Sequence, residues 1–145
     1  MQTDKSVDTL NSILRGEISA VETYSQAIEK LHDDADITVQ LESCRLSHEQ
    51  RVSLLRSEIA SRGGEPTQGS GPWGVFVKVV EGGAKVFGKK AAIAALEEGE
   101  DHGLKQYRDD LPKLDVSTRS KLEPQLMPEQ ERTHRTMSTL KHTLH

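Results

Sequence analysis

The chain has 145 residues, of which 3% are aromatic and 29% are charged, and its formal net charge is −4. This length suits one domain, and a charged composition with few aromatic residues favours amphipathic helices over a β-sandwich. The acidic balance argues against a general nucleic-acid binder, because no basic excess is available to neutralise phosphates. The single cysteine, the lack of a signal peptide and the lack of a long apolar run lead us to expect a cytoplasmic protein.

The first stretch of the chain, residues 5–31, is typical of an amphipathic helix. Its apolar residues recur at spacings of three and four, which marks the line of core-facing positions that we call the seam. Glu17 interrupts this seam, and Tyr24 follows seven residues later. The acidic cluster at residues 33–36 then ends the helix and can cap the next one. We therefore expect a buried acid in the middle of the first helix.

A second helix is predicted to run to about Ser61. Arg45 and His48 fill the polar interval of its seam. Gly63 followed by Pro66 ends it, since glycine at a helix end followed by proline is a strong stop signal. The short connection to the first helix predicts an antiparallel hairpin.

A crossover over residues 63–88 follows this first hairpin, which covers residues 5–62. Valine and phenylalanine residues between Trp73 and Phe87 are interrupted by two glycines, so we expect a short or broken helix there. The alternative is a membrane-surface or dimer-forming patch, because lysines accompany the apolar residues. These lysines are Lys78, Lys85, Lys89 and Lys90.

The third helix begins near Lys89 and opens a second hairpin over residues 89–145. Its seam holds two acids, Glu97 and Glu100. Tyr107 follows Glu100 by the same seven residues that separate the acid and the tyrosine of the first helix. Both tyrosines are expected to pack in the core with their hydroxyls on nearby carboxylates.

The fourth helix should start from a cap at Asp115 or Ser117. Because it contains Pro124 and Pro128, we expect its first half to be bent or irregular. The whole pattern predicts an all-α antiparallel four-helix bundle, with a long crossover between the second and third helices.

Ionisable residues of the four seams should meet at one height in this bundle. Isolated buried charges are expensive, so such groups must satisfy each other, trap water or bind a cation. Glu131 and His134 form an i, i+3 pair that points a carboxylate and an imidazole at one centre. Carboxylates and histidines inside four helices are a ligand set for iron or manganese. The candidate metal ligands are Glu17, His48, Glu97, Glu100, Glu131 and His134.

This arrangement resembles the ferritin-like superfamily, especially rubrerythrins and bacterioferritins. Those proteins have a glutamate followed seven residues later by tyrosine on the first helix, one or two glutamates on the third, and an ExxH motif on the second and fourth. The similar residues here are Glu17 with Tyr24, Glu97 and Glu100, and Glu131 with His134.

The resemblance covers nearly the whole chain. The Trp73-bearing crossover and the run Gly63-Gly64-Glu65-Pro66 look closer still to an uncharacterised bacterial domain family assigned to that superfamily. This resemblance implies a ferritin-like bundle with a metal centre in its core.

The second helix departs from the ferritin-like pattern. Arg45 stands three residues before His48, where the pattern has a bridging glutamate, and a guanidinium cannot ligate a metal. Arg45 would instead pair with Glu17 or Glu100. The centre is then either a metal-free salt-bridge network or a site for iron, manganese or another divalent metal with fewer ligands.

Two functions follow from these alternatives. The first is a ferritin-like protein that binds iron for metal handling or for the oxidative-stress response. Whether such a protein would be an enzyme stays open, and no catalytic residue is assigned. The second is a non-catalytic helical interaction protein with a metal-free polar core, which self-associates as a homo-oligomer or contacts a membrane surface through the crossover.

Overall fold

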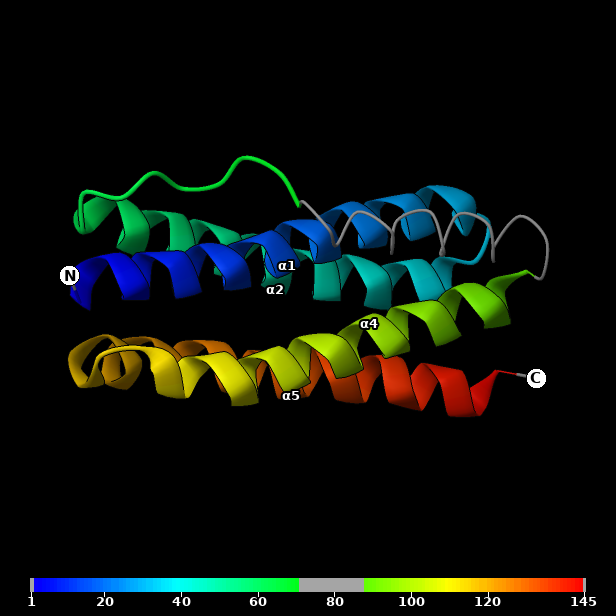
Figure 1. Cartoon of the computed structure of the whole chain (residues 1–145). Helices are drawn as coiled ribbons and strands as arrows, with labels where there is room; N and C mark the ends of the chain where they lie inside the picture. Colours follow the sequence, from blue (N-terminus) through cyan, green and yellow to red (C-terminus); the bar gives the residue numbers. More distant parts are fainter. Residues whose placement is uncertain (1, 71–87, 145) are drawn as a thin grey trace.

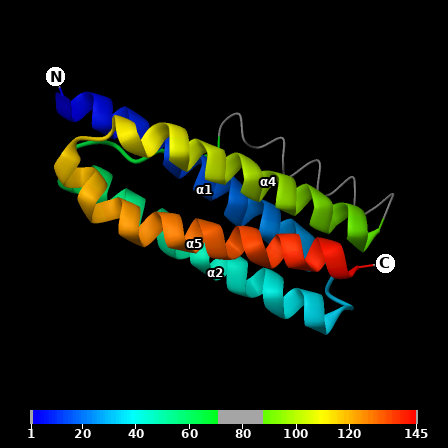
Figure 2. The same ribbon diagram turned by 90° about the horizontal axis from the view of Figure 1, so that it is seen from below.

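The computed structural model describes residues 2–70 and 88–144, and it shows four long helices packed side by side (Figures 1 and 2). The predicted all-α antiparallel four-helix bundle is confirmed for these residues. The expected short helix of the crossover, and with it most of the apolar patch, falls at residues 71–87 and lies outside the described residues. The elements are α1 (Gln2–Lys30), α2 (Ala35–Ser61), α4 (Lys89–Asp110), the 3-10 turn η2 (Leu111–Lys113) and α5 (Val116–Thr143).

Aspartates cap the N-termini of two helices. The side chain of Asp34 accepts a hydrogen bond from the backbone N–H of Ile37 at 3.1 Å, at the start of α2. Asp115 does the same for the backbone N–H of Thr118 at 3.1 Å, at the start of α5. Each carboxylate satisfies a donor that has no partner within its own helix. These caps set where the second helix of each hairpin begins.

The C-terminus of α2 ends in a left-handed turn at Gly63, which has a φ of 76°. The N–H of Gly63 donates to the carbonyl of Ala60, and the N–H of Gly64 donates to the carbonyl of Ile59, each at 3.0 Å. This pair of bonds is the Schellman motif, which favours glycine because a side chain would be strained at that φ. A Cβ on Gly64 would lie 2.8 Å from a methyl group of Val7, so the turn also packs closely against α1.

Helix α5 runs without a break through Pro124 and Pro128. The irregular first half that the sequence suggested is therefore absent from its secondary structure. Each proline lacks an N–H, which leaves a carbonyl of the preceding turn without its helical partner. Both prolines are on the exposed side of the helix, where water can reach such carbonyls.

The apolar core is divided into two clusters. One cluster packs around residues such as Leu41, Ile93 and Met137, and the other packs around residues such as Leu14 and Leu55. In each helix, buried polar residues lie between the segments that supply the two clusters. The bundle therefore has a polar layer near the middle of its length.

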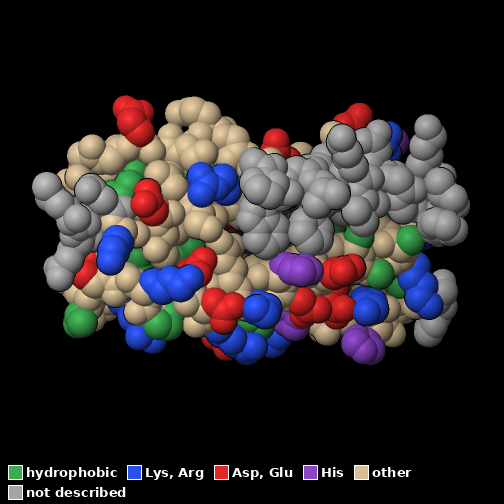
Figure 3. All heavy atoms as spheres, in the orientation of Figure 1, with side chains coloured by type: hydrophobic (Ala, Val, Ile, Leu, Met, Phe, Trp, Pro, Cys, Tyr) green, Lys and Arg blue, Asp and Glu red, His purple; other side chains and the backbone are tan. Residues whose placement is uncertain are grey.

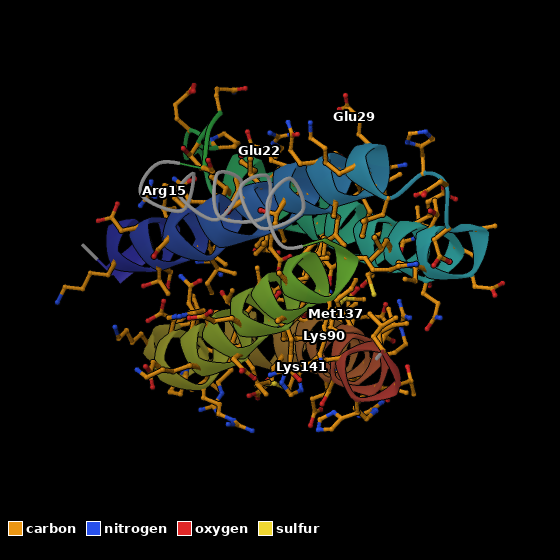
Figure 4. All side chains as sticks on the ribbon, turned by 90° about the vertical axis from the view of Figure 1, so that its right-hand side faces the viewer. Arg15, Glu22, Glu29, Lys90, Met137 and Lys141 are labelled. Carbon is orange, nitrogen blue, oxygen red and sulfur yellow. The ribbon has the colours of Figure 1, made fainter. Side chains whose placement is uncertain are left out.

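The outer faces of the bundle are charged. Glu22 and Glu29 on α1 point away from the other helices (Figure 4). Acidic and basic side chains are interspersed over the face shown in Figure 3. Among the described residues, no helix combines the length and the apolar character that crossing a membrane requires.

Candidate functional site

His48 on α2 bridges two glutamates from different helices. Its Nδ1 lies 2.5 Å from Oε1 of Glu17 on α1, and its Nε2 lies 2.8 Å from Oε2 of Glu100 on α4. A neutral imidazole has only one N–H. In the protonated ring both nitrogens donate, and the two carboxylates favour that form because they raise the pKa of His48. Nη2 of Arg51 also lies 3.3 Å from Nε2 of His48.

Two tyrosines join the hairpins reciprocally. The hydroxyl of Tyr24 on α1 donates to Oε2 of Glu100 at 2.6 Å, and the hydroxyl of Tyr107 on α4 donates to Oε2 of Glu17. The Tyr24 ring also stacks on the His48 ring, with 5.4 Å between the ring centroids. The tyrosine of each hairpin thus bonds the glutamate of the other hairpin.

Arg51, one turn after His48 on α2, places a guanidinium inside the bundle. The residue is only 2% exposed. Its Nη1 donates to Oε2 of Glu17 at 3.4 Å and to Oε1 of Gln130. Its Nη2 donates to the hydroxyls of Ser47 at 3.0 Å and Thr133 at 3.1 Å. Arg51 therefore connects α1 and α2 with α5.

Helix α5 contributes neutral polar groups. Nε2 of Gln130 donates to Oε1 of Glu100 at 3.0 Å, and the hydroxyl of Thr133 donates to the same oxygen at 2.7 Å. A Cβ on Gly103 would lie 2.8 Å from Nε2 of Gln130, so the absence of a side chain there gives Gln130 room to reach α4. With Tyr24 and His48 on its other oxygen, the Glu100 carboxylate accepts four side-chain bonds.

We call this set the polar centre. Its members are Glu17, Tyr24, Ser47, His48, Arg51, Glu100, Tyr107, Gln130 and Thr133.

The charges of the polar centre stabilise one another. Burial, the largest effect, raises the pKa of Glu17, but Arg51 and His48 outweigh it and hold that pKa at about 2. The pKa of Glu100 is also lowered, because His48, the tyrosine hydroxyl and Arg51 overcome its burial. Burial and Arg51 lower the pKa of His48, but the two carboxylates outweigh them and raise it overall. The two carboxylates therefore face Arg51 and His48, and each favours the charged form of the groups it faces.

A cavity of about 40 Å³ lies between α1 and α4, beside the polar centre. This volume has room for one or a few water molecules, because a water needs roughly 10–15 Å³ of such space. It is too small for an organic substrate. The residues lining it include the buried Glu17, His48 and Glu100 and the small Gly16, Ala20 and Gly99.

Three of the predicted metal ligands meet at the polar centre, and three do not. Glu17, His48 and Glu100 are the three that meet. Glu97 lies at the rim, where Nζ of Lys141 is 2.9 Å from its carboxylate.

The other two predicted ligands on α5 face outward. His134 contacts Asp101 at 2.5 Å near the surface, and Glu131 is exposed. Gln130 and Thr133 occupy the inward positions instead, so the predicted face of α5 was wrong by one residue. Within the described ranges, no three His, Cys, Asp or Glu side chains are grouped so that they could hold a metal ion.

Arg45 is likewise placed differently from the prediction. Its side chain is 33% exposed and pairs with Glu49, one turn later on α2, at 3.3 Å. The buried guanidinium belongs to Arg51, which the sequence analysis did not identify. A signal for it exists, because Arg51 continues the core spacing from His48 to Leu55 by steps of three and four.

Comparison with known proteins gives one family and no individual relative. No curated protein and no solved structure shows a significant match to the chain. The resemblance to the ferritin-like superfamily therefore stays a prediction. Residues 5–113, from α1 to η2, match the family described as Domain of unknown function (DUF2383). Since this match covers more than half of the 145 residues, the chain belongs to the DUF2383 family.

Proposed function

We propose that this is a non-catalytic helical interaction protein, whose polar centre fixes the alignment of its two hairpins. The observation that carries this proposal is the reciprocal pair of bonds from Tyr24 to Glu100 and from Tyr107 to Glu17. Sliding one hairpin along the other by a helical turn, about 5.4 Å, would break both bonds at once. Buried polar residues have this role of fixing register in other helical assemblies.

The polar centre does not fit a metal ion well. The oxygens of Glu17 and Glu100 already accept bonds from His48, Arg51 and other donors of the chain. A metal bound to these carboxylates would displace His48 and Arg51 from them, leaving the buried guanidinium without a carboxylate partner. The cations that neutralise this centre are therefore the protein's own.

A second copy of the chain is the proposed partner, and a membrane surface is the alternative. This part of the proposal is supported by the sequence of the crossover, where Val75, Phe76 and Val79 are accompanied by lysines. Apolar residues grouped in this way are typical of association surfaces.

Metal handling remains the second candidate function. It is favoured by the contacts of His48 with Glu17 and Glu100, because carboxylates and imidazole are ligands of iron and manganese, although these three side chains would have to rearrange to hold an ion. It would require a neutral His48 and a displaced Arg51. The resemblance to ferritin-like proteins, with iron in oxidative-stress chemistry, supports the same candidate.

Elemental analysis separates these two functions. We expect protein purified with ferrous iron or manganese to contain far less than one ion per chain, because His48 and Arg51 already neutralise the carboxylates. The melting temperature should be the same with and without the metal. Stoichiometric metal that disappears in Glu100→Gln would overturn the proposal and assign metal handling. The double variant Glu131→Ala, His134→Ala is the control, since both side chains lie outside the polar centre.

Light scattering tests the interaction itself. Replacing Val75, Phe76 and Val79 with serine should lower the mass of the particle, because it removes the apolar residues proposed to self-associate. The matched control replaces Val39 and Leu46, which are 66% and 56% exposed on α2, and should leave the mass unchanged. Equal masses for all three proteins, together with no binding to liposomes, would rule out both proposed partners.

A further inference from the structure

The guanidinium of Arg51 is surrounded by oxygen atoms from three helices. In addition to its bonds to Glu17, Gln130, Ser47 and Thr133, its Nε donates to the backbone carbonyl of Ser47 at 3.4 Å. Arginine has five N–H donors in a flat fork. Here the acceptors are placed around that fork, and its three nitrogens all donate.

These acceptors carry little negative charge. The oxygen acceptors are one carboxylate, one amide oxygen, two hydroxyls and one backbone carbonyl, and Nη2 of Arg51 also lies 3.3 Å from the ring nitrogen Nε2 of His48. A divalent ion is usually held by several carboxylates, whereas one carboxylate among neutral acceptors balances a single positive charge. The acceptors reach all three nitrogens of the guanidinium, and their charge matches a single positive charge.

The acceptors do not depend on Arg51 for their backbone positions. Glu17 is held by Tyr107 and His48, and Gln130 and Thr133 are held by Glu100. Arg51 enters the site only through the flexible stem of its side chain. If the side chain were truncated to alanine, the oxygen atoms that accept its hydrogen bonds would still line the same space.

We propose that Glu17, Ser47, Gln130 and Thr133 form a guanidinium-binding site, which Arg51 fills in the native chain and which takes up free guanidinium when the Arg51 side chain is removed. The inference rests on the proposed role of the polar centre, because the occupant of this site links α1 and α2 to α5. The ligand class is a planar monocation with several N–H donors.

The test measures, by thermal melting, whether low-millimolar guanidinium chloride restores the stability of Arg51→Ala. Breaking a buried charge pair should lower the melting temperature by roughly 10 °C. We expect free guanidinium to restore at least half of this loss, because a ligand that binds only the folded state stabilises it. Tetramethylammonium, which has no N–H donor, should restore nothing.

Three comparisons make the result specific. The melting temperature of the wild type should not rise when guanidinium is added, because Arg51 already fills the site. Arg45→Ala, which removes a partly exposed guanidinium from the same helix, should melt like the wild type and also show no gain. If manganese raised the melting temperature of Arg51→Ala more than guanidinium does, the inference would be overturned, and the emptied site would be a site for a divalent metal.

The inference stays testable if Arg51→Ala does not fold at all. In that case, the helical circular dichroism signal of the variant should return when guanidinium is added. If the signal does not return, the guanidinium-binding site is ruled out. The double variant Glu17→Gln, Arg51→Ala lacks the carboxylate and should respond less to guanidinium than the single variant does. Metal bound by the wild type would overturn the proposed function, whereas absence of rescue beside a metal-free wild type would overturn only the guanidinium site.

Discussion

Replacing Glu100 with glutamine should lower the free energy of unfolding by about 3–5 kcal/mol, the range seen when one partner of a buried ion pair is removed. The glutamate is 3% exposed and accepts side-chain bonds from Tyr24, His48, Gln130 and Thr133. Glutamine has a similar volume, so little of the effect comes from a cavity. The substitution removes one of the two negative charges of the polar centre. The NH₂ group of glutamine would also face N–H or O–H donors, whose hydrogen bonds the carboxylate oxygen accepted. Equilibrium unfolding in urea measures the loss.

Two other glutamates of α4 provide the matched controls. Glu98 is exposed, so Glu98→Gln should change the unfolding free energy by less than about 0.5 kcal/mol. Glu97 pairs with the half-exposed Lys141 at the rim, and Glu97→Gln should cost no more than about 1 kcal/mol. If Glu100→Gln were as mild as these two, the polar centre would not be what aligns the hairpins.

The sequence was sufficient to predict that Glu17 on α1 and Glu100 on α4 lie in the centre, although the same pattern also placed there Glu97, which lies at the rim. Glu17 and Glu100 each lie in a seam that apolar residues define on both sides, so the orientation of the helix was certain before the acid was placed. The tyrosine that follows each glutamate by seven residues lies on the same face, two turns further along. Local periodicity therefore determined this half of the polar centre.

The same reasoning placed His48 on α2 correctly, but it chose Arg45 instead of Arg51 on that helix and outward-facing residues on α5. Both helices have polar runs around the centre, and a polar run contains no contrast that tells the inner face from the outer one. Adjacent residues of a helix differ by about 100° in direction, so an error of one position turns a side chain out of the core. That error selected His134 over Thr133. Only the packing against α4 decides which of them faces Glu100.

Acid should destabilise the bundle through Glu17. Its pKa falls from 4.5 to about 2 on folding, so it stabilises the folded state above pH 4.5 and loses that effect as the pH falls towards 2. A difference of about 2.5 pKa units corresponds to about 3 kcal/mol. Glu100 acts in the same direction, because its pKa is also lowered. Urea unfolding at a series of acidic pH values should show this decline.

The variant Glu17→Gln tests the origin of the acid effect. It should be less stable than the wild type at neutral pH, but its stability should fall less steeply below pH 4.5, because the titrating group is gone. Glu22→Gln, on the exposed face of the same helix, should follow the wild type at every pH. Parallel acid curves for Glu17→Gln and the wild type would contradict the assignment. His48 acts with the opposite sign. Its raised pKa stabilises the fold below pH 6.5, and this contribution is lost as the pH rises and the ring loses one of the two N–H groups that face Glu17 and Glu100.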